Sequence, residues 1–228
     1  MDLSLEYILL LWPGLLRGLW VTLQLFFLTL VLSLPLGLLI ALGRISRFWP
    51  LRNLCRVYIW LFRGTPLMLQ LCFFYYGLGY IAYTNDLLFL RFGRFPSAVL
   101  TFTLNYAAYF AEIYRAGIQS IDRGQYEAAK ALGFSRVRTM FMIIIPQTIR
   151  RIIPPVSNET ITLVKDTALV YVIALSELLK SSKDAANRDT NTTAYLLAAI
   201  CYLAITFVLS MISQKLEKRY SRHERETI

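Results

Sequence analysis

The sequence predicts an all-α membrane protein with five transmembrane helices. Hydrophobic residues make up 57% of the 228 residues and the mean hydropathy is +0.51, values that are typical of membrane proteins. A bilayer core requires about 20 apolar residues per helix. Four segments reach that length, and a fifth is interrupted by Glu159, Lys165 and Asp166. The expected spans are residues 19–42, 57–82, 97–118, 152–175 and 194–212, so that residues 1–228 form a single transmembrane domain.

Prolines and glycines predict where these helices end or bend. Residues 5–16 are expected to form a short interfacial helix that ends near Trp12-Pro13-Gly14, before the first span. In the second span, Pro66 removes a backbone donor and Gly64 loosens the preceding turn. A bend is therefore expected there.

The net charge of +10 follows from membrane topology and does not indicate an affinity for nucleic acid. Sixteen of the 24 Lys and Arg residues lie in the segments after spans one, three and five, counting Arg115 at the inner end of span three, and six lie at the N-terminus or after spans two and four. This alternation is the positive-inside pattern, which places the N-terminus outside and the C-terminus inside. The remaining two, Arg63 and Lys165, lie within apolar spans.

The sequence contains no constellation suited to catalysis or to metal binding. Cys55, Cys72 and Cys201 lack the spacing of metal ligands and are expected to be small core residues. His223, the single histidine, is expected to be solvated in the charged C-terminal tail. Without a glycine-rich phosphate loop either, the chain is not expected to be an enzyme or to hold a metal or cofactor of its own.

Arg63 and the polar third span have two interpretations. Asn105, Tyr109 and Glu112 give that span a polar stripe, and Glu112 is expected to face protein rather than lipid. Arg63 either extends its guanidinium to the inner lipid headgroups or forms a buried pair with a carboxylate, for which Glu112 is the candidate. The sequence leaves both interpretations open.

The segment between spans three and four has a pattern of its own. Asp122 can cap a helix over residues 125–132, with Gly133 as its C-terminal stop, and a second helix over residues 135–145 is expected to end at Pro146. Such a loop either lies on the membrane surface as an amphipathic connector or is held by another protein. Its adjacent alanines and its glycine favour the second, because small side chains let another backbone approach closely and glycine permits a sharp turn.

The same segment resembles the signature of permease subunits of binding-protein-dependent ABC importers. The signature E-A-A-x3-G-x9-I-x-L-P reads here as Glu127-Ala128-Ala129, Gly133, Ile143, Ile145 and Pro146, with a volume-conserving isoleucine in place of leucine at Ile145. Four further segments resemble the polar amino acid permeases of that group, so that the resemblance runs from about Leu15 to Ile212. They are Leu15–Leu23 with Gly18 and Thr22, Arg63-Gly64-Thr65-Pro66-Leu67 with Gln70, Ala111-Glu112-Ile113-Tyr114-Arg115 with Gly117-Ile118-Gln119-Ser120, and Lys165-Asp166-Thr167 with Leu169.

This resemblance implies a multi-pass subunit of an amino acid importer in a bacterial inner membrane, with the type I ABC importer permease fold. Implied partners are a second permease, identical or homologous, an extracytoplasmic amino-acid-binding protein, and two ATP-binding subunits that carry ATP and Mg. Residues 123–134 would be the coupling helix that docks on an ATPase. The residues implied in that contact are Gln125, Glu127, Ala128, Ala129, Leu132, Gly133 and Phe134.

Charged residues of the fourth span make the best candidate for a substrate site. Glu159 and Asp166 are seven residues apart, which places them on one face of a regular helix together with Thr162. Charges inside a membrane are costly unless they face a cavity or a partner. Either Lys165 pairs internally with a carboxylate, or the group forms a pocket for the ammonium and carboxylate of an amino acid. The candidate substrate-binding residues are Glu159, Thr162, Lys165, Asp166 and Tyr106.

Two other classes of function account for less of the sequence. An ion-coupled secondary transporter or channel, with Glu159 and Asp166 as ion sites, leaves the patterned loop unexplained. A structural membrane anchor leaves the charges within the spans unexplained. The sequence therefore favours alternating access driven by partner ATPases, without identifying the amino acid.

Overall fold

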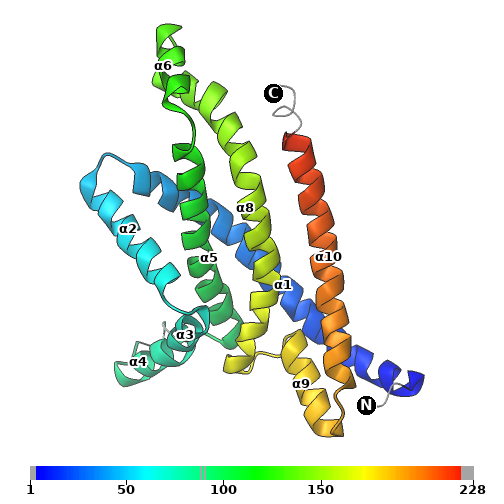
Figure 1. The fold of residues 1–228 in the computed structure, drawn as a ribbon. Helices are drawn as coiled ribbons and strands as arrows, with labels where there is room; N and C mark the ends of the chain where they lie inside the picture. Colours follow the sequence, from blue (N-terminus) through cyan, green and yellow to red (C-terminus); the bar gives the residue numbers. More distant parts are fainter. Residues whose placement is uncertain (1–3, 88, 90, 222–228) are drawn as a thin grey trace.

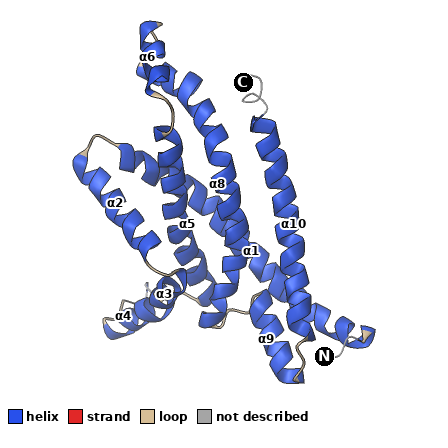
Figure 2. Ribbon diagram, in the orientation of Figure 1, coloured by secondary structure: helices blue, strands red, loops and turns tan. Residues whose placement is uncertain are grey.

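Helices account for all regular secondary structure in the part of the chain that the computed structural model describes, residues 4–87, 89 and 91–221; His223 lies outside it. In Figure 1, α5, α8 and α10 stand side by side and α1 crosses them obliquely, and Figure 2 shows that short loops connect the helices. The α-helices are α1 (Leu5–Ile45), α2 (Trp49–Gly64), α3 (Leu67–Cys72), α4 (Leu78–Thr84), α5 (Arg94–Gln119), α6 (Arg123–Ala131), α7 (Arg136–Thr139), α8 (Ile145–Asp166), α9 (Leu178–Asp189) and α10 (Thr193–Ser221), with the π-helices η1 (Phe73–Gly77) and η3 (Met140–Ile144) and the 3-10 helix η4 (Thr167–Ile173).

The first helix is longer than the sequence predicts. α1 runs without interruption through Pro13 and Pro35, so the separate interfacial helix expected over residues 5–16 does not exist. Proline removes one hydrogen bond from a helix but need not end it, and long apolar helices tolerate proline where packing supports them. The prediction of a stop at Pro13 was wrong because it weighed the proline alone.

Small buried residues on α1 let neighbouring helices approach it closely. A Cβ atom at Gly37 would lie 2.8 Å from Cβ of Phe110 on α5, and one at Gly18 would lie 2.8 Å from the backbone oxygen of Glu177, the cap of α9. Such positions accept no larger residue without movement of a backbone. This type of contact is characteristic of helices that pack inside membranes.

The second expected span is bent, as Pro66 predicts. α2 ends at Gly64, and the helical run Leu67–Thr84 leaves at an angle of 104°. Among the described residues, two helices are long and apolar enough to cross a membrane, α1 and Thr193–Tyr220 of α10, or three if this bent pair is one broken span. The count of five spans therefore stays a prediction.

Two amide side chains complete the hydrogen bonding at the bend. Pro66 has no N–H, so it cannot bond the carbonyl of Phe62 one turn earlier. Gln70 Nε2 donates to that oxygen over 2.9 Å and Asn105 Nδ2 over 3.0 Å. Asn105 Nδ2 also donates to Gln70 Oε1 over 3.0 Å. Side-chain hydrogen bonds from α3 and from α5 therefore stabilise the bend, which is called the α2–α3 junction below.

The chain remains helical through the prolines that follow α6. The sequence predicts that a helix over residues 135–145 ends at Pro146, and this prediction is wrong. Pro146 occupies the first turn of α8, directly after the π-helix η3. The missing N–H of a proline costs least in a first turn. Farther along, the expected fourth span (residues 152–175) is α-helical only as far as Asp166 and then tightens into η4.

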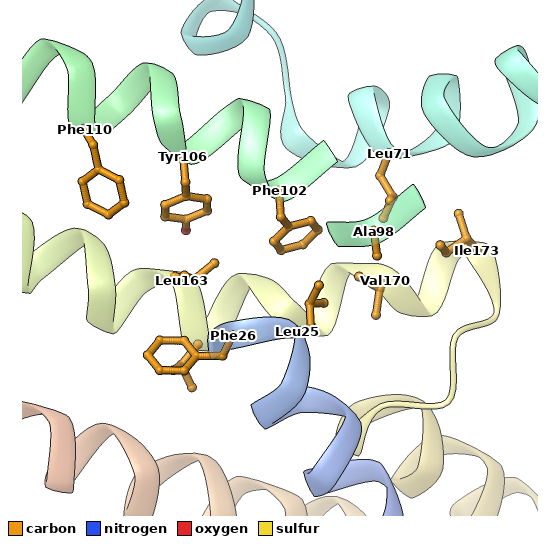
Figure 3. Close-up of a cluster of buried hydrophobic side chains, with 11 residues drawn as sticks. Leu25, Phe26, Leu71, Ala98, Phe102, Tyr106, Phe110, Leu163, Val170 and Ile173 are labelled. Atoms are coloured by element: carbon orange, nitrogen blue, oxygen red, sulfur yellow. The ribbon is translucent and has the colours of Figure 1, made fainter. Parts of the chain in front are cut away.

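An aromatic core joins α5 to α8. Phe102, Tyr106 and Phe110 are buried on α5, and Figure 3 shows their rings pointing toward Leu163 of α8. The three side chains recur at intervals of four residues, which places them on one face of the helix. This core fixes the polar faces of α5 and α8 relative to each other.

Candidate functional site

A cavity of about 490 Å³ lies beside the junction of α2 and α3, between α5 and α8. Its walls carry one guanidinium group and two carboxyl groups, together with hydroxyl, amide and aromatic side chains. The cavity thus combines charges of both signs with the helix break at Gly64–Pro66. The lining residues are Arg63, Gly64, Thr65, Pro66, Leu67, Asn105, Tyr106, Tyr109, Glu159, Thr162 and Asp166.

Four of the five predicted substrate residues meet in this cavity. Glu159, Thr162 and Asp166 reach it from one face of α8, and Tyr106 from α5. Lys165 is not among the lining residues and its side chain is exposed on another face of α8. One helical position is 100° around the axis from the next, so Lys165 cannot share the face of both carboxylates.

The position of Asp166 is fixed by a hydrogen bond between helices. Tyr106, which is 2% exposed, donates its hydroxyl to Asp166 Oδ2 over 2.7 Å. Thr162 Oγ1 instead donates to the carbonyl of Asn158 in its own helix. Glu159 forms no ion pair with any described residue. The cavity thus holds one restrained carboxylate and one that is available to a ligand.

Arg63 contributes the positive charge of the cavity, and it does not pair with Glu112. The guanidinium carbon lies 5.2 Å from the centroid of the Tyr109 ring, a cation–π distance. Glu112 pairs instead with Arg115 on its own helix, with 2.9 Å between Nε and Oε2. A residue three positions along the same helix is a nearer partner than one on another helix. The Arg63–Glu112 pair, one of the two interpretations that the sequence left open, is therefore not formed.

Sequence reasoning missed Arg63 and Asn105 as lining residues, together with the backbone of residues 64–67, whereas Tyr109, which it offered as a possible wall of the pocket along with Tyr171, does line the cavity. Two signals were present. A glycine and a proline within an apolar span mark a broken helix, and broken helices in transporters adjoin binding sites. The polar stripe on the third span indicated a face turned away from lipid. Only the fold brings the two signals to one cavity.

The loop helix α6 lies at the end of the helical bundle opposite the α2–α3 junction (Figure 1). It forms largely as predicted. Asp122 caps it, with Oδ1 accepting from Gly124 N over 2.6 Å. It ends at Ala131, and Gly133 then adopts φ +77°, a conformation that glycine adopts without strain. The helix is thus three residues shorter than the predicted 123–134. Its exposed predicted contact residues are Gln125, Glu127, Ala128, Leu132 and Gly133.

Two residues of the predicted contact differ from the others. Ala129 is only 1% exposed, because it lies on the inner face of α6, and its carbonyl accepts from Phe134 N over 2.9 Å. Phe134 is half-buried, with its ring 4.5 Å from the guanidinium carbon of Arg138. In this conformation the small side chain of Ala129 packs α6 on its own chain. The predicted contact of Ala129 with a partner stays a prediction.

The helices on either side of α6 are tied together. A Cβ atom at Gly117 of α5 would overlap Cγ2 of Ile152 on α8 and lie 3.2 Å from Cγ2 of Thr148. Arg151 of α8 donates to the carbonyl and the hydroxyl of Ser120, just after α5. Movement of α6 would therefore be passed to α5 and α8 together.

A buried carboxyl group that the sequence did not single out lies near the start of α9. Glu177 is fully buried and caps α9, accepting from Leu179 N over 2.7 Å and from Lys180 N over 2.6 Å. Tyr202 of α10 donates its hydroxyl to the same carboxylate over 3.0 Å. Burial raises the pKa of Glu177 to about 7, although these donors oppose the rise. This group joins α9 to α10 beside α1.

Comparison with known proteins gives one consistent result. The family model of binding-protein-dependent transport system inner membrane components matches residues 33–222. The L-cystine transport system permease protein TcyB of Bacillus subtilis is 39% identical, over 93% of this chain and 88% of that protein. The arginine transport system permease protein ArtQ of the same organism is 36% identical, over 93% and 94%. A crystal structure of an amino acid ABC transporter with histidines superposes with a TM-score of 0.86 at 33% identity, covering 96% of this chain and 100% of that one.

Proposed function

Because the chain belongs to the family of binding-protein-dependent transport system inner membrane components, it is the permease subunit of an ABC importer, and we propose that a polar or charged amino acid crosses through the cavity between α2, α5 and α8. As an inner-membrane permease it is not the ATPase of that importer. An ATP-binding subunit and an extracytoplasmic binding protein are its partners. ATP and Mg bind on the ATPase, and this chain requires no cofactor.

The observation that carries the substrate proposal is the pairing of charges around the cavity. Arg63 approaches from the α2–α3 junction, whereas Glu159 and Asp166 approach from α8. A zwitterionic amino acid presents a carboxylate and an ammonium group, which match a guanidinium and a carboxylate. The names of two relatives, which refer to cystine and arginine transport, support the same substrate class.

Each cavity residue has a distinct part in this proposal. Arg63 holds the substrate carboxylate, and Glu159 receives the ammonium group because it has no ion pair with the residues that the structure describes. Asp166 adds negative charge and is kept in place by Tyr106. Thr162 offers a hydroxyl from the same face of α8. Such a set recognises the ammonium and carboxylate groups that all amino acids share. Selectivity for the substrate's side chain then depends on the shape of the cavity and on its remaining charge.

The proposed assembly is a pair of permeases, with a copy or a homologue of this chain as the second. Each permease crosses the membrane five times, with the N-terminus outside and the C-terminus inside. The charge distribution supports that orientation. The positions of the described termini at opposite ends of the molecule in Figure 1 also agree with an odd number of crossings. In this orientation α6 faces the cytoplasm, where the ATPases are.

The proposed mechanism is alternating access. ATP binding brings two ATPases together and moves the α6 helices of both permeases. The motion reaches α5 and α8 through their tie at Gly117 and Arg151. Because both helices line the cavity, their movement opens it toward the loaded binding protein. Hydrolysis reverses the movement and releases the amino acid inward.

Uptake by the complete importer in proteoliposomes tests the substrate site. Radiolabelled arginine, glutamine, histidine and cystine serve as the panel, with binding protein outside and ATP inside. Glu159→Gln should reduce uptake of the preferred substrate about tenfold or more, in line with loss of one charge-assisted contact. Glu217→Gln, on the exposed end of α10, is the matched control. Equal uptake by the two variants would refute the site, and loss of the ATPase from purified Glu159→Gln would indicate a structural role instead.

A further inference from the structure

Three arginines gather where α1 turns into α2. Arg44 lies in the last turn of α1, and Arg52 and Arg56 lie on successive turns of α2. The two helices meet closely here, because a Cβ atom at Gly43 would lie 2.6 Å from Cys55 Sγ. The positive charges of Arg56 and Arg52 act on the Arg44 guanidinium. We call Arg44, Arg52 and Arg56 the arginine corner.

No carboxylate among the described residues neutralises the arginine corner. The acidic group that acts on Arg44 is Glu112, and both oxygens of Glu112 are already engaged by Arg115. The charge of Arg115 also acts on Arg44 and adds to the repulsion. Like charges held together without an anion destabilise a fold. The corner therefore calls for a negatively charged group that residues 4–87, 89 and 91–221 do not provide.

Arg52 has a polar atom that points to the same conclusion. Its Nε is buried and has no hydrogen-bond partner among the described residues. Buried donors in folded proteins are almost always paired, and a guanidinium offers a fork of donors that suits phosphate oxygens. The Arg52 side chain lies one turn before Cys55, on the face of α2 that packs toward α1. An oxyanion at the corner would satisfy this donor.

The surroundings of the corner favour a lipid over a protein partner. Trp49 and Trp60 of α2 are 63% and 73% exposed, and Phe48, Leu54 and Val57 are exposed beside them. Tryptophan beside basic residues is typical of the level of the lipid headgroups. In Figure 1, α6 projects well beyond the α1–α2 turn, which lies on the same half of the molecule as the end of α10. The corner is therefore placed at a membrane surface rather than at the docking level of α6.

We propose that the arginine corner binds the phosphate of an anionic phospholipid of the cytoplasmic leaflet, whose acyl chains lie along the exposed apolar side of α2. The inference uses the orientation given under the proposed function, but not the substrate site. Basic pockets between helices on the cytoplasmic side are suited to anionic headgroups. The lipid would supply the counter-charge that keeps α1 and α2 together beside the cavity.

Native mass spectrometry of the purified importer, with its ATP-binding subunits, tests the proposal. The protein is delipidated and offered phosphatidylglycerol or phosphatidylcholine with identical acyl chains. The variant Arg44→Gln/Arg52→Gln/Arg56→Gln should bind phosphatidylglycerol about a hundredfold more weakly than the wild type, since each of the three basic residues removed contributes roughly a fivefold factor near an anionic membrane. The matched control, Lys215→Gln/Lys218→Gln/Arg219→Gln, removes the same charge from the exposed end of α10 and should retain the wild-type amount.

Three outcomes would overturn the proposal. Equal losses in the two triple variants would mean that only general basicity attracts the lipid. Stabilisation of the wild type by inorganic phosphate alone, to the same extent as by phosphatidylglycerol, would identify a free-phosphate site. Loss of the ATP-binding subunit from the corner variant, with lipid retained, would identify a docking surface for that subunit. If the triple glutamine variant does not assemble, Arg52→Lys serves instead, because lysine keeps the charge and loses the forked donor; undiminished lipid binding in that variant would count against the proposal.

Discussion

The hydroxyl of Tyr106 donates a hydrogen bond of 2.7 Å to Asp166, and this contact joins α5 to α8 in the wall of the charged cavity. Tyr106 is also part of the aromatic core. One side chain therefore connects the packing of the bundle to the polarity of the site. A single substitution that removes the hydroxyl and keeps the ring can distinguish the contribution of the hydrogen bond from that of the packing.

Tyr106→Phe should raise the substrate concentration for half-maximal uptake about tenfold while the complex still assembles. The ring remains in the core, but Asp166 loses a hydrogen bond to a charged group, which is worth about 1.5–3 kcal/mol. Uptake against substrate concentration in proteoliposomes measures this. Tyr109→Phe is the comparison, because it keeps the ring near Arg63, and a smaller effect is expected. Effects of equal size would contradict a specific role for the Tyr106 hydroxyl.

Gln70→Ala should destabilise the importer at the α2–α3 junction. The substitution leaves Asn105 with one acceptor fewer and removes a donor from the Phe62 carbonyl. Buried polar groups without partners cost about 1–3 kcal/mol each. The midpoint of thermal unfolding in detergent should fall accordingly. Gln147→Ala removes an amide hydrogen bond to Gln125 in an exposed setting and should change stability by less than about 0.5 kcal/mol. Equal losses of stability in Gln70→Ala and Gln147→Ala would contradict a stabilising role for the hydrogen bonds at the α2–α3 junction.

Gly117→Ala should weaken the tie between α5 and α8. The added methyl group overlaps the Ile152 side chain, and overpacking of this kind typically costs about 1–3 kcal/mol. Ile152→Ala in the same chain should restore much of the loss by making room. Gly14→Ala is the matched control, since nothing lies within 4 Å of a Cβ atom there, and it should be neutral or slightly stabilising. Unfolding midpoints of the wild type and the three variants decide, and a failure of Ile152→Ala to rescue would refute the steric account.

Gly133→Val should uncouple ATP hydrolysis from uptake. At φ +77° a β-branched residue is strained by about 1–3 kcal/mol, so the turn after α6 would change direction. The ATPase rate stimulated by binding protein and the uptake rate are measured on the same preparation. Gly133→Asn, which tolerates a positive φ, should keep the two in proportion. Coupled transport at the wild-type ratio in Gly133→Val would contradict the assignment of α6 as the coupling helix.

Glu177 should make the stability of the importer depend on pH. Burial raises its pKa to about 7 from a reference value of 4.5, so the folded chain holds this proton more tightly than the unfolded chain. The resulting stabilisation is complete below the reference value and is lost as pH rises through about 7. Thermal midpoints between pH 5 and pH 8 should therefore decline in the wild type. Glu177→Gln, which carries no titrating proton, should show a flatter profile, and an unchanged slope would rule Glu177 out as the cause.

Local pattern was enough to predict several parts of the structure. The Asp122 cap, the glycine after α6 and the bend at Pro66 each depend on the residue itself and its near neighbours. The common face of Glu159 and Asp166 follows from helical periodicity alone. Family membership followed from the same short motifs, and the comparisons confirm it.

The errors share a physical origin, because each depends on which element packs against which. Pro13 does not end α1, since packing of the surrounding helix outweighs one missing hydrogen bond. Glu112 pairs with Arg115 within its own helix rather than with Arg63, and the burial of Ala129 against its own chain was likewise not foreseen. No periodicity in the sequence specifies such neighbours. The burial of Glu177 is of the same kind, since α10 is distant in sequence.

The close contact of Gly117 with Ile152 can also be viewed as a fulcrum. Ile152 and Asp166 are fourteen residues apart on α8, a separation of about 21 Å along a regular helix. A tilt of α8 by about 10° around the contact would therefore displace the Asp166 end by about 4 Å. That displacement exceeds the length of a hydrogen bond, so a modest rotation imposed at α6 is enough to separate the charged walls of the cavity or bring them together. Since α8 has an arm on each side of this point, the chain converts a movement at the membrane surface into one at the substrate without any part of α8 having to unfold.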